Sequence, residues 1–310
     1  MSIIDKHIFS DHTQTCPRLT RVDDQTLLVR AAAKINLSLA VGAERPDGYH
    51  TFESLMATVS LFDELTIRRD KPGITLACDD SYVPTDSRNL VYRAASLLAW
   101  CAKVQPDVHI EIVKRIPTEA GLGGASSDAA AALIGLNELW NLTMPLEKLH
   151  QISSVLGSDV NFFLAGPLAI CRGRGEHVEP LNLNWDFRAV ILQPAHRLPT
   201  GKVYRHHRVS DPSCFGLADR LAKLLPARRP GQLTGLFQND LEPAAFRVND
   251  SLGSLRHDLE AFAGTSVRLS GSGSAMFAIF DTWEQSVEFM LKIGQAYPEL
   301  ACWLVRSNPW

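Results

Sequence analysis

The stretch Pro117-Thr118-Glu119-Ala120-Gly121-Leu122-Gly123-Gly124-Ala125-Ser126-Ser127-Asp128 leads directly into an alanine-rich helical pattern. Its three glycines, Gly121, Gly123 and Gly124, allow backbone conformations that a Cβ atom forbids and let the chain approach a ligand closely. The helix predicted over 126–140 presents unpaired N–H groups and a partial positive charge at its start. The segment therefore predicts an anion cradle, although an isolated glycine-rich loop is more often only a turn.

Two common phosphate-binding motifs do not fit the spacing of these glycines. A Walker loop places a lysine directly after its last glycine, and no lysine follows here. A dinucleotide-binding fingerprint needs a third glycine or alanine three residues after the second, where this chain has Ser126. A helix terminus alone contributes only ~0.3–1 kcal/mol per charge. Several N–H groups, hydroxyls and a cation must therefore act together to hold a polyphosphate.

The composition narrows the class of protein. The chain has 310 residues, of which 45% are hydrophobic and 21% are charged, as in ordinary globular proteins. Its net charge of −3 disfavours a protein that mainly grips a nucleic-acid backbone. The six cysteines form no CxxC pair, and no apolar run approaches the ~20 residues of a membrane helix. We therefore expect a cytoplasmic protein with reduced thiols that binds neither membrane nor nucleic acid.

Strand and helix patterns are interspersed along both halves of the chain, which predicts an α+β fold. Residues 1–24 are polar and aperiodic, and we expect them to form a loose extension. The pattern changes near 181–188, which divides the remainder into two predicted domains, 25–182 and 188–310. Helical spacing predicts helices over 89–102, 126–140, 145–156 and 158–163, and one that starts at residue 282.

Residues 31–41 alternate between apolar and polar side chains, which is typical of a half-buried strand. This alternation places Lys34 and Asn36 on the same face, two residues apart. The segment Arg45-Pro46-Asp47-Gly48 then has the composition of a turn. An amine and an amide are therefore predicted side by side on one strand.

The Pro-x-x-x-Gly-Leu-Gly-Gly-x-Ser-Ser form of 117–127 resembles the phosphate loop of the GHMP kinases, small-molecule kinases without a Walker motif. The segments 33–37 and 45–50 resemble, more narrowly, the branch that phosphorylates 4-diphosphocytidyl-2-C-methyl-D-erythritol. Residues 157–164 resemble the catalytic segment of that branch, and 269–275 resemble the third GHMP motif. The segments follow one another in the family's order between about residues 30 and 280.

This resemblance implies a two-domain GHMP kinase fold of mixed sheets and helices, with the active site in the cleft between the domains. It implies ATP as co-substrate, Mg²⁺, and transfer to the 2-hydroxyl of the cytidine diphosphate substrate. Asp159 corresponds to the catalytic base and Lys34 to its partner. The implied ATP-binding residues are Pro117, Gly121, Leu122, Gly123, Gly124, Ala125, Ser126 and Ser127. The implied substrate-binding residues are Asn36, Tyr49, His50, Tyr204, Gly271, Ser272 and Gly273.

Within the resemblance, Asn36 contacts the acceptor, Tyr49 stacks on the cytosine, His50 hydrogen-bonds to it, and Tyr204 forms a second wall. Each residue also has a simpler interpretation. Asp159 could only stabilise a helix start, Lys34 could be an exposed strand lysine, and Tyr204 could be a half-buried strand tyrosine. The basic run 205–208 is interpreted as a solvated surface.

Two other functions remain open from the sequence. One is another GHMP kinase, of the homoserine or mevalonate type, and the other is a nucleotide-binding regulator without catalytic activity. The turn that carries Tyr49 and His50 favours a cytidine substrate over the first. The presence of Lys34 and Asp159 argues against the second. The sequence does not identify the metal ligands or the adenine contacts, and a monomer or a homodimer is expected.

Overall fold

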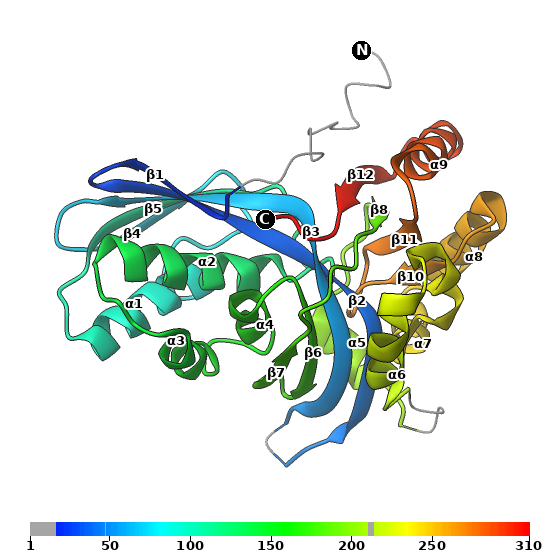
Figure 1. Cartoon of the computed structure of the whole chain (residues 1–310), viewed down its shortest axis with the longest axis horizontal. Coiled ribbons are helices and arrows are strands. Elements are labelled where there is room, and N and C mark those ends of the chain that lie inside the picture. Colours follow the sequence, from blue (N-terminus) through cyan, green and yellow to red (C-terminus); the bar gives the residue numbers. More distant parts are fainter. Residues whose placement is uncertain (1–16, 47, 210–213) are drawn as a thin grey trace.

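Two long antiparallel strands run through the centre of the molecule and belong to both of its halves (Figure 1). They are β2 (Thr26–Glu44) and β3 (His50–Arg69) in a computed structural model that describes residues 17–46, 48–209 and 214–310. The predicted turn joins them, and the Gly48 N–H donates a hydrogen bond to the Arg45 carbonyl. Strand β2 pairs with β3 and also with Gln238–Asn239 of the second half.

The first sheet carries the amino-terminal helices. The order along its main path is β1 (Leu19–Asp23), β2, β3, β5 (Asp107–Val113) and β4 (Gly73–Cys78). Three more strands complete it: β6 (Leu168–Gly173) pairs with β3, β7 (His177–Pro180) pairs with β6, and β9 (Gln238–Asn239) pairs with β2. Helices α1 (Leu90–Ala102) and α2 (Gly124–Leu139) pack together beneath it, and α2 contacts both β2 and β3 (Figure 1). The remaining elements of this half are helices α3 (Leu146–Ser153) and α4 (Val160–Ala165).

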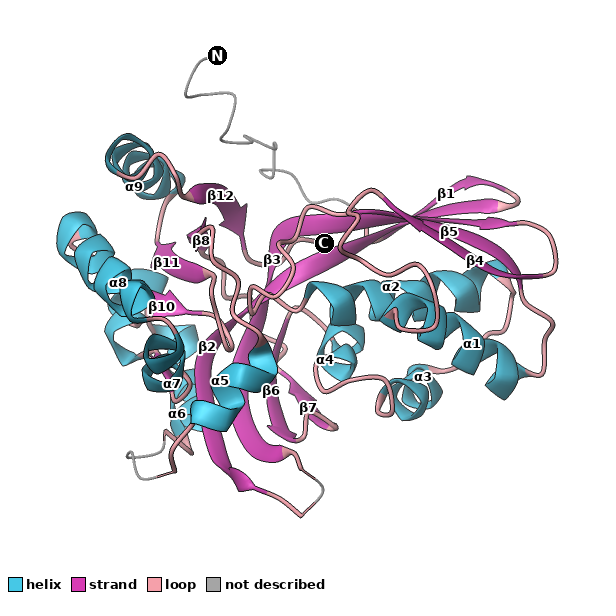
Figure 2. Cartoon of the chain, turned by 180° about the vertical axis from the view of Figure 1, so that it is seen from behind, coloured by secondary structure: helices cyan, strands magenta, loops and turns pink. Residues whose placement is uncertain are grey.

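The second sheet has the order β10 (Val267–Leu269), β11 (Met276–Phe280), β8 (Arg188–Gln193) and β12 (Ala301–Arg306). Helices α8 (Asp250–Ala263) and α9 (Trp283–Ala296) pack against it (Figure 2). The connecting elements are α5 (Thr200–His206), α6 (Leu217–Leu224), short 3₁₀ turns over Leu225–Ala227, Pro230–Gln232 and Thr234–Leu236, β9 (Gln238–Asn239) and α7 (Glu242–Val248).

A buried apolar cluster joins β2 to the second sheet. Ala33, Ile35 and Leu37 of β2 pack in one cluster with Phe187 and Phe277 of the second half. Because these apolar side chains face the second sheet, the alternate residues of β2 point to the other side, where the cavity described below lies. Both sides of this strand are buried, so the prediction of a half-buried strand is wrong in that respect.

The predicted α+β fold is confirmed, with differences in particular elements. Leu19–Asp23 form strand β1 rather than part of a loose extension, while residues 1–16 lie outside the described residues. Most side chains of β1 are exposed, and the strand is held by main-chain pairing with β2. Such a strand needs no apolar pattern, so nothing in the sequence indicated it. Residues 52–61 of strand β3 are all buried, so this stretch of the strand does not alternate between apolar and polar side chains. Helix α4 begins after Asp159 rather than after Ser158.

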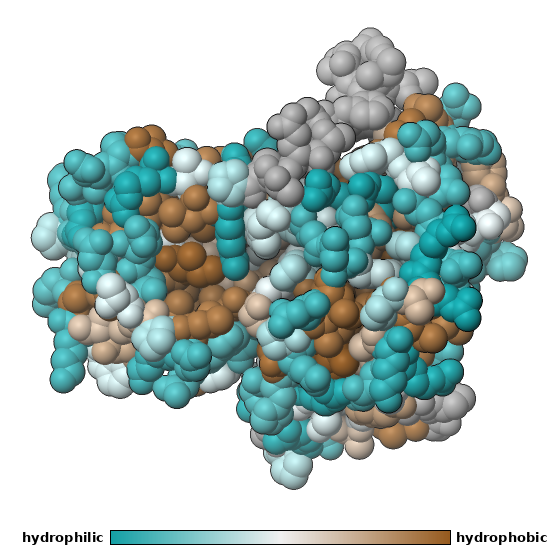
Figure 3. All heavy atoms as spheres, in the orientation of Figure 1, coloured by the Kyte–Doolittle hydropathy of each residue, from teal (hydrophilic) through white to brown (hydrophobic). Residues whose placement is uncertain are grey.

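The surface on the side shown in Figure 3 is mostly hydrophilic, and its apolar side chains are concentrated in recessed areas. None of the helices in the described ranges combines the length and the apolar character needed to cross a bilayer.

Candidate active site

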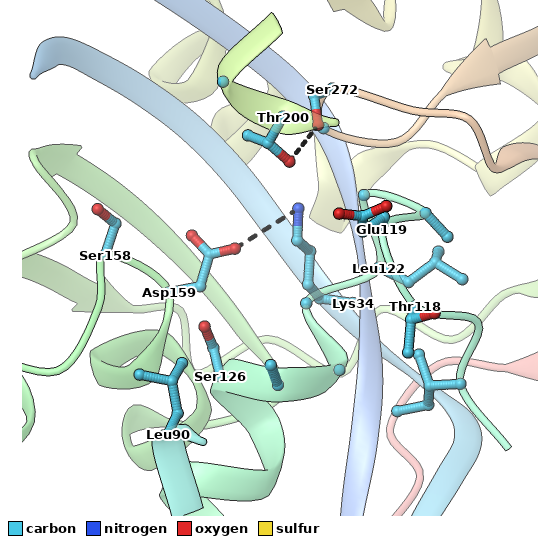
Figure 4. A pocket seen from close by; sticks show the side chains of 18 of the residues that line it. Lys34, Leu90, Thr118, Glu119, Leu122, Ser126, Ser158, Asp159, Thr200 and Ser272 are labelled. Carbon is cyan, nitrogen blue, oxygen red and sulfur yellow. Dashed lines mark hydrogen bonds and ion pairs between the residues drawn. The ribbon is translucent and has the colours of Figure 1, made fainter. Parts of the chain in front are cut away.

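A cavity of about 800 Å³ lies between the elements of the two halves (Figure 4). Its walls come from β2, from the turn before β3, from the glycine loop 117–126, from Ser158 and Asp159, and from α5 and the 271–272 loop. Most of the residues that the sequence singled out lie on these walls. They are Lys34, Asn36, Tyr49, His50, Pro117, Gly121, Leu122, Gly123, Gly124, Ala125, Ser126, Asp159, Tyr204, Gly271 and Ser272.

Lys34 is buried at the centre of the cavity, with only 4% of its surface exposed. Its main-chain N–H donates to the Leu122 carbonyl at 2.9 Å, which ties the glycine loop to β2. Its ammonium donates to Asn36 Oδ1 at 2.5 Å and lies 3.8 Å from Asp159 Oδ2. Burial lowers the pKa of Lys34, and the negative charge of Asp159 opposes that shift. The simpler interpretation of an exposed strand lysine is therefore wrong.

Asp159 stands at the start of α4, but its side chain makes no capping hydrogen bond. Its carboxylate points instead toward the Lys34 ammonium (Figure 4). A quarter of the side chain is exposed to the cavity. A carboxylate in this place can accept the proton of a hydroxyl group bound in the cavity. The structure thus brings together two residues separated by 125 positions, as the resemblance implied.

The glycine loop packs closely on the third motif. A Cβ atom on Gly121, which has a φ of 76°, would lie 1.9 Å from the Ser270 carbonyl oxygen. The Ser270 hydroxyl donates to the Gly121 carbonyl at 2.9 Å. Glycine is therefore required at this position both by the backbone conformation and by the approach of the second chain segment. The contact holds the loop open toward Lys34 as one edge of the cavity.

Two residues expected in the site, Ser127 and Gly273, are not on the cavity walls. The Ser127 N–H donates to the Gly123 carbonyl within the first turn of α2, and its side chain is buried because it lies about 100° around the helix from Ser126. The Gly273 N–H donates to the Ser270 carbonyl in a tight turn. Both N–H groups are thus already used within the protein.

The opposite end of the cavity is aromatic. The His50 and Tyr204 rings lie 5.3 Å apart between centroids, and the exposed Tyr49 ring stands next to His50 in the chain. Tyr204 lies in helix α5, so the alternative of a strand tyrosine is wrong. Burial, reinforced by the charge of Asp159, raises the pKa of the Tyr204 hydroxyl, which therefore stays protonated.

His50 has a defined tautomer. Its Nδ1 lies 2.8 Å from the Gly42 carbonyl oxygen, which can only accept a hydrogen bond. The Nδ1 atom therefore carries the proton, and in the neutral ring Nε2 is left as an acceptor.

Asn36 is already engaged on both ends of its amide. Its oxygen accepts from Lys34, and its Nδ2 donates to the Ser54 hydroxyl at 2.8 Å. The Ser54 hydroxyl in turn donates to the Ser38 carbonyl at 2.5 Å. This chain fixes the amide so that its oxygen faces the ammonium. Asn36 is therefore a hydrogen-bond partner of Lys34. Its contact with the acceptor hydroxyl stays a prediction.

A buried ionic cluster below the glycine loop was not predicted. The Lys114 ammonium pairs with Asp63 and, at 2.7 Å, with Asp128. Asp63 also accepts from the main-chain N–H groups of Arg115 and Ile116. Burial and the negative charge of Asp63 raise the pKa of Asp128 to about 8. Burial lowers the pKa of Lys114, but its two neighbouring carboxylates outweigh burial, so the pKa of Lys114 is raised above its ordinary value. The cluster anchors the start of α2 to the sheet.

Sequence reasoning also missed several cavity residues. The Thr200 hydroxyl lies 3.0 Å from that of Ser272, and both side chains stand above Lys34 (Figure 4). Further walls near α1 are formed by Tyr82, Val83, Pro84, Arg88, Asn89 and Leu90. Asn89 carried a local signal, since its side chain caps α1 through the Val91 N–H, but capping alone gives no hint of a cavity.

Comparisons with known proteins identify the family to which this fold belongs. A family model described as the GHMP kinases N terminal domain matches residues 89–167, and a second, described as GHMP kinases C terminal, matches residues 221–299. A crystal structure of a homoserine kinase from Cytophaga hutchinsonii superposes with a TM-score of 0.73 at 19% identity, over 93% of this chain and 96% of the other. The fold and the glycine loop therefore define a GHMP kinase, a small-molecule kinase that uses ATP as co-substrate.

More similar relatives specify the branch. A 4-diphosphocytidyl-2-C-methyl-D-erythritol kinase from Shouchella clausii is 38% identical over 82% of this chain and 85% of its own length. One from Synechococcus sp. is 34% identical over 92% and 95%. A crystal structure of 4-(cytidine 5'-diphospho)-2C-methyl-D-erythritol kinase has a TM-score of 0.74 at 35% identity, covering 90% of this chain and 98% of that one. The chain belongs to the 4-diphosphocytidyl-2-C-methyl-D-erythritol kinases, and the resemblance seen in the sequence is confirmed.

Proposed function

We propose that this enzyme transfers the γ-phosphoryl group of ATP to the 2-hydroxyl of 4-diphosphocytidyl-2-C-methyl-D-erythritol, a step of the non-mevalonate isoprenoid pathway. The observation that carries the proposal is the Lys34–Asp159 pair, which lies beside the glycine loop in a single cavity with an aromatic end. A phosphate site, a base and a wall for a nucleobase are the three parts that this substrate pair requires.

The proposed reaction is a direct transfer. The Asp159 carboxylate accepts the proton of the 2-hydroxyl while the oxygen of that hydroxyl forms a bond to the γ-phosphorus. The bond between the γ-phosphorus and the bridging oxygen breaks, and ADP leaves. Lys34, held by Asn36 and Asp159, places positive charge beside the transferring group. Positioning and electrostatics suffice for this chemistry, so no covalent intermediate with the enzyme is required.

The glycine loop is the proposed phosphate site. Its residues Gly123 to Ser126 open helix α2, whose N-terminal N–H groups and dipole favour an anion. Glu119 also lies on the cavity wall and is exposed to solvent. Its carboxylate therefore meets bulk water, which reduces its repulsion of a phosphate group.

Mg²⁺ is part of the proposal, as an ion bound mainly to the nucleotide. Within the described ranges, no group of three or more His, Cys, Asp or Glu side chains could hold a metal by itself. The cavity does offer the Ser126 hydroxyl at the start of α2, and magnesium commonly uses one or two protein oxygens together with substrate phosphates. Ser126 would hold the ion, which would supply neutralisation of phosphate charge and leave Asp159 as the base.

The cytosine is assigned to the aromatic end. Its amino group would donate to the free Nε2 of His50, while its ring stacks between Tyr49 and Tyr204. Base stacking on an aromatic side chain is worth ~1–3 kcal/mol, which is enough to favour a cytidine compound over an alcohol without a base.

We retain the remaining expectations as part of this proposal. They are a division into domains over 25–182 and 188–310, a monomer or homodimer, and a cytoplasmic location. The division places the two matched family segments in separate domains. The free thiols of Cys78, Cys101, Cys171, Cys214 and Cys302 suit a reducing compartment.

The test is an ADP-release assay with a panel of acceptors. The enzyme should release ADP with 4-diphosphocytidyl-2-C-methyl-D-erythritol and far more slowly with homoserine or mevalonate. Phosphorylation of the 2-hydroxyl should be confirmed by ³¹P NMR of the product. A preference for homoserine or mevalonate would reassign the substrate, and ATP binding without transfer to any acceptor would indicate a regulator instead.

A further inference from the structure

Arg174 covers one face of the Tyr49 ring. The carbon at the centre of its guanidinium lies 4.0 Å from the centre of that ring, within the range of a cation–π contact. Tyr49 lines the cavity, whereas Arg174 is not among the lining residues. The guanidinium therefore supports the ring from behind and leaves its cavity side open. Tyr49 needs such a support, because it stands after a turn and is 51% exposed.

The turn that carries Arg174 also touches the catalytic segment. It connects β6 to β7, and the Arg174 N–H donates to the Glu176 carboxylate while the Gly175 N–H donates to the Arg172 carbonyl. A Cβ atom on Gly175 would lie 2.0 Å from the Ser158 carbonyl oxygen. The turn is thus pressed against the residue that precedes Asp159. One short segment therefore contacts both the residue before the base and the aromatic end of the cavity.

We infer that Arg174 is a positioning residue for recognition of the pyrimidine. It holds the Tyr49 ring at a fixed place relative to Asp159, so that a base stacked on the open face brings its attached acceptor hydroxyl to the carboxylate. This inference rests on the proposed function, since it deepens the recognition of the cytidine substrate. Holding a side chain in its binding position before the ligand arrives lowers the entropic cost of binding.

The shape of arginine matters in this role. Its guanidinium is planar and stacks on an aromatic face, whereas the compact lysine ammonium is a point charge on a flexible stem. Arg174→Lys keeps the charge and loses the plane, so it should resemble Arg174→Ala rather than wild type. In a second role, the charge of Arg174 would attract the diphosphate of the substrate. That role predicts that Arg174→Lys resembles wild type and that only Arg174→Ala is impaired.

The experiment compares KM and kcat of Arg174→Ala and Arg174→Lys with the wild-type enzyme. We expect KM for the cytidine substrate to rise by ~5–30-fold in both, with KM for ATP and kcat within about twofold of wild type. Cytidine, which carries no phosphate, should lose inhibitory strength by the same factor. In the Tyr49→Ala background, Arg174→Ala should have no further effect. The matched control is Arg197→Ala, which removes a guanidinium 4.9 Å from the ring of Tyr82, another cavity residue, and should leave KM for the cytidine substrate unchanged.

Three outcomes would overturn the inference: an unchanged KM in Arg174→Ala, an additive effect with Tyr49→Ala, or full activity of Arg174→Lys with unaltered inhibition by cytidine. The last result would assign Arg174 to the diphosphate. Failure of the proposed function is distinguishable, because the wild-type enzyme itself would then not phosphorylate the cytidine substrate.

Discussion

Replacement of Asp159 by asparagine tests the central pair of the site. The substitution keeps the size of the side chain and removes both its ability to accept a proton and its negative charge. Loss of a general base lowers turnover by ~10²–10⁴-fold. ATP affinity should remain within about twofold of wild type, because the glycine loop is anchored by Lys34 and Ser270 rather than by Asp159.

The structure adds a second effect, on the pKa of Lys34. At the 3.8 Å that separates Lys34 Nζ from Asp159 Oδ2, two unit charges attract by about 4 kcal/mol at an effective dielectric constant of about 20. A quarter of the Asp159 side chain is exposed, so water reduces this attraction to ~1–2 kcal/mol. The carboxylate raises the pKa of Lys34, which burial has lowered. Its removal therefore lowers that pKa further.

The assay is ADP release by wild type and Asp159→Asn across the neutral and alkaline range, with ATP binding measured separately by calorimetry. The alkaline limb of the residual activity should move to lower pH, because loss of the Asp159 charge lowers the pKa of Lys34 further. Asp258→Asn, an exposed carboxylate on α8 outside the cavity, is the matched control and should change neither turnover nor the pH profile. Turnover of Asp159→Asn within about tenfold of wild type, or an alkaline limb that moves upward, would refute the reasoning.

Three further predictions concern the loop, its anchor and the aromatic end. Gly121→Ala would place a methyl group 1.9 Å from a carbonyl oxygen, so KM for ATP should rise at least ~10-fold, whereas Gly235→Ala, whose Cβ meets nothing within 4 Å, should leave it unchanged. Asp63→Asn should lower the free energy of unfolding by ~1.5–3 kcal/mol in urea titrations, because the buried cluster loses the charged hydrogen bonds of Asp63 while Lys114 keeps its pair with Asp128; a loss below ~0.5 kcal/mol would contradict this. Tyr49→Ala should raise KM for the cytidine substrate by ~10-fold or more and leave KM for ATP unchanged; an equal rise in both would place Tyr49 elsewhere.

Local patterns in the sequence determined the parts of this protein that depend on neighbours along the chain. The glycine loop and helix α2 could be predicted because the loop, the helix start and the apolar side are all contiguous. The turn before Tyr49 could be predicted from its composition. The roles of Lys34 and Asp159 came from the resemblance, since neither residue carries a distinctive local signal.

The tertiary structure alone decided what depends on distant contacts. Residues 52–61 of strand β3 are all buried, so this stretch does not alternate and the length of the strand could not be predicted. The Asp63–Lys114–Asp128 cluster joins three elements, and each residue alone looks like an ordinary surface charge in the sequence. The stacking of Arg174 on Tyr49 likewise joins segments 125 residues apart. Such contacts follow from the packing of sheets and loops, which periodicity along the chain does not record.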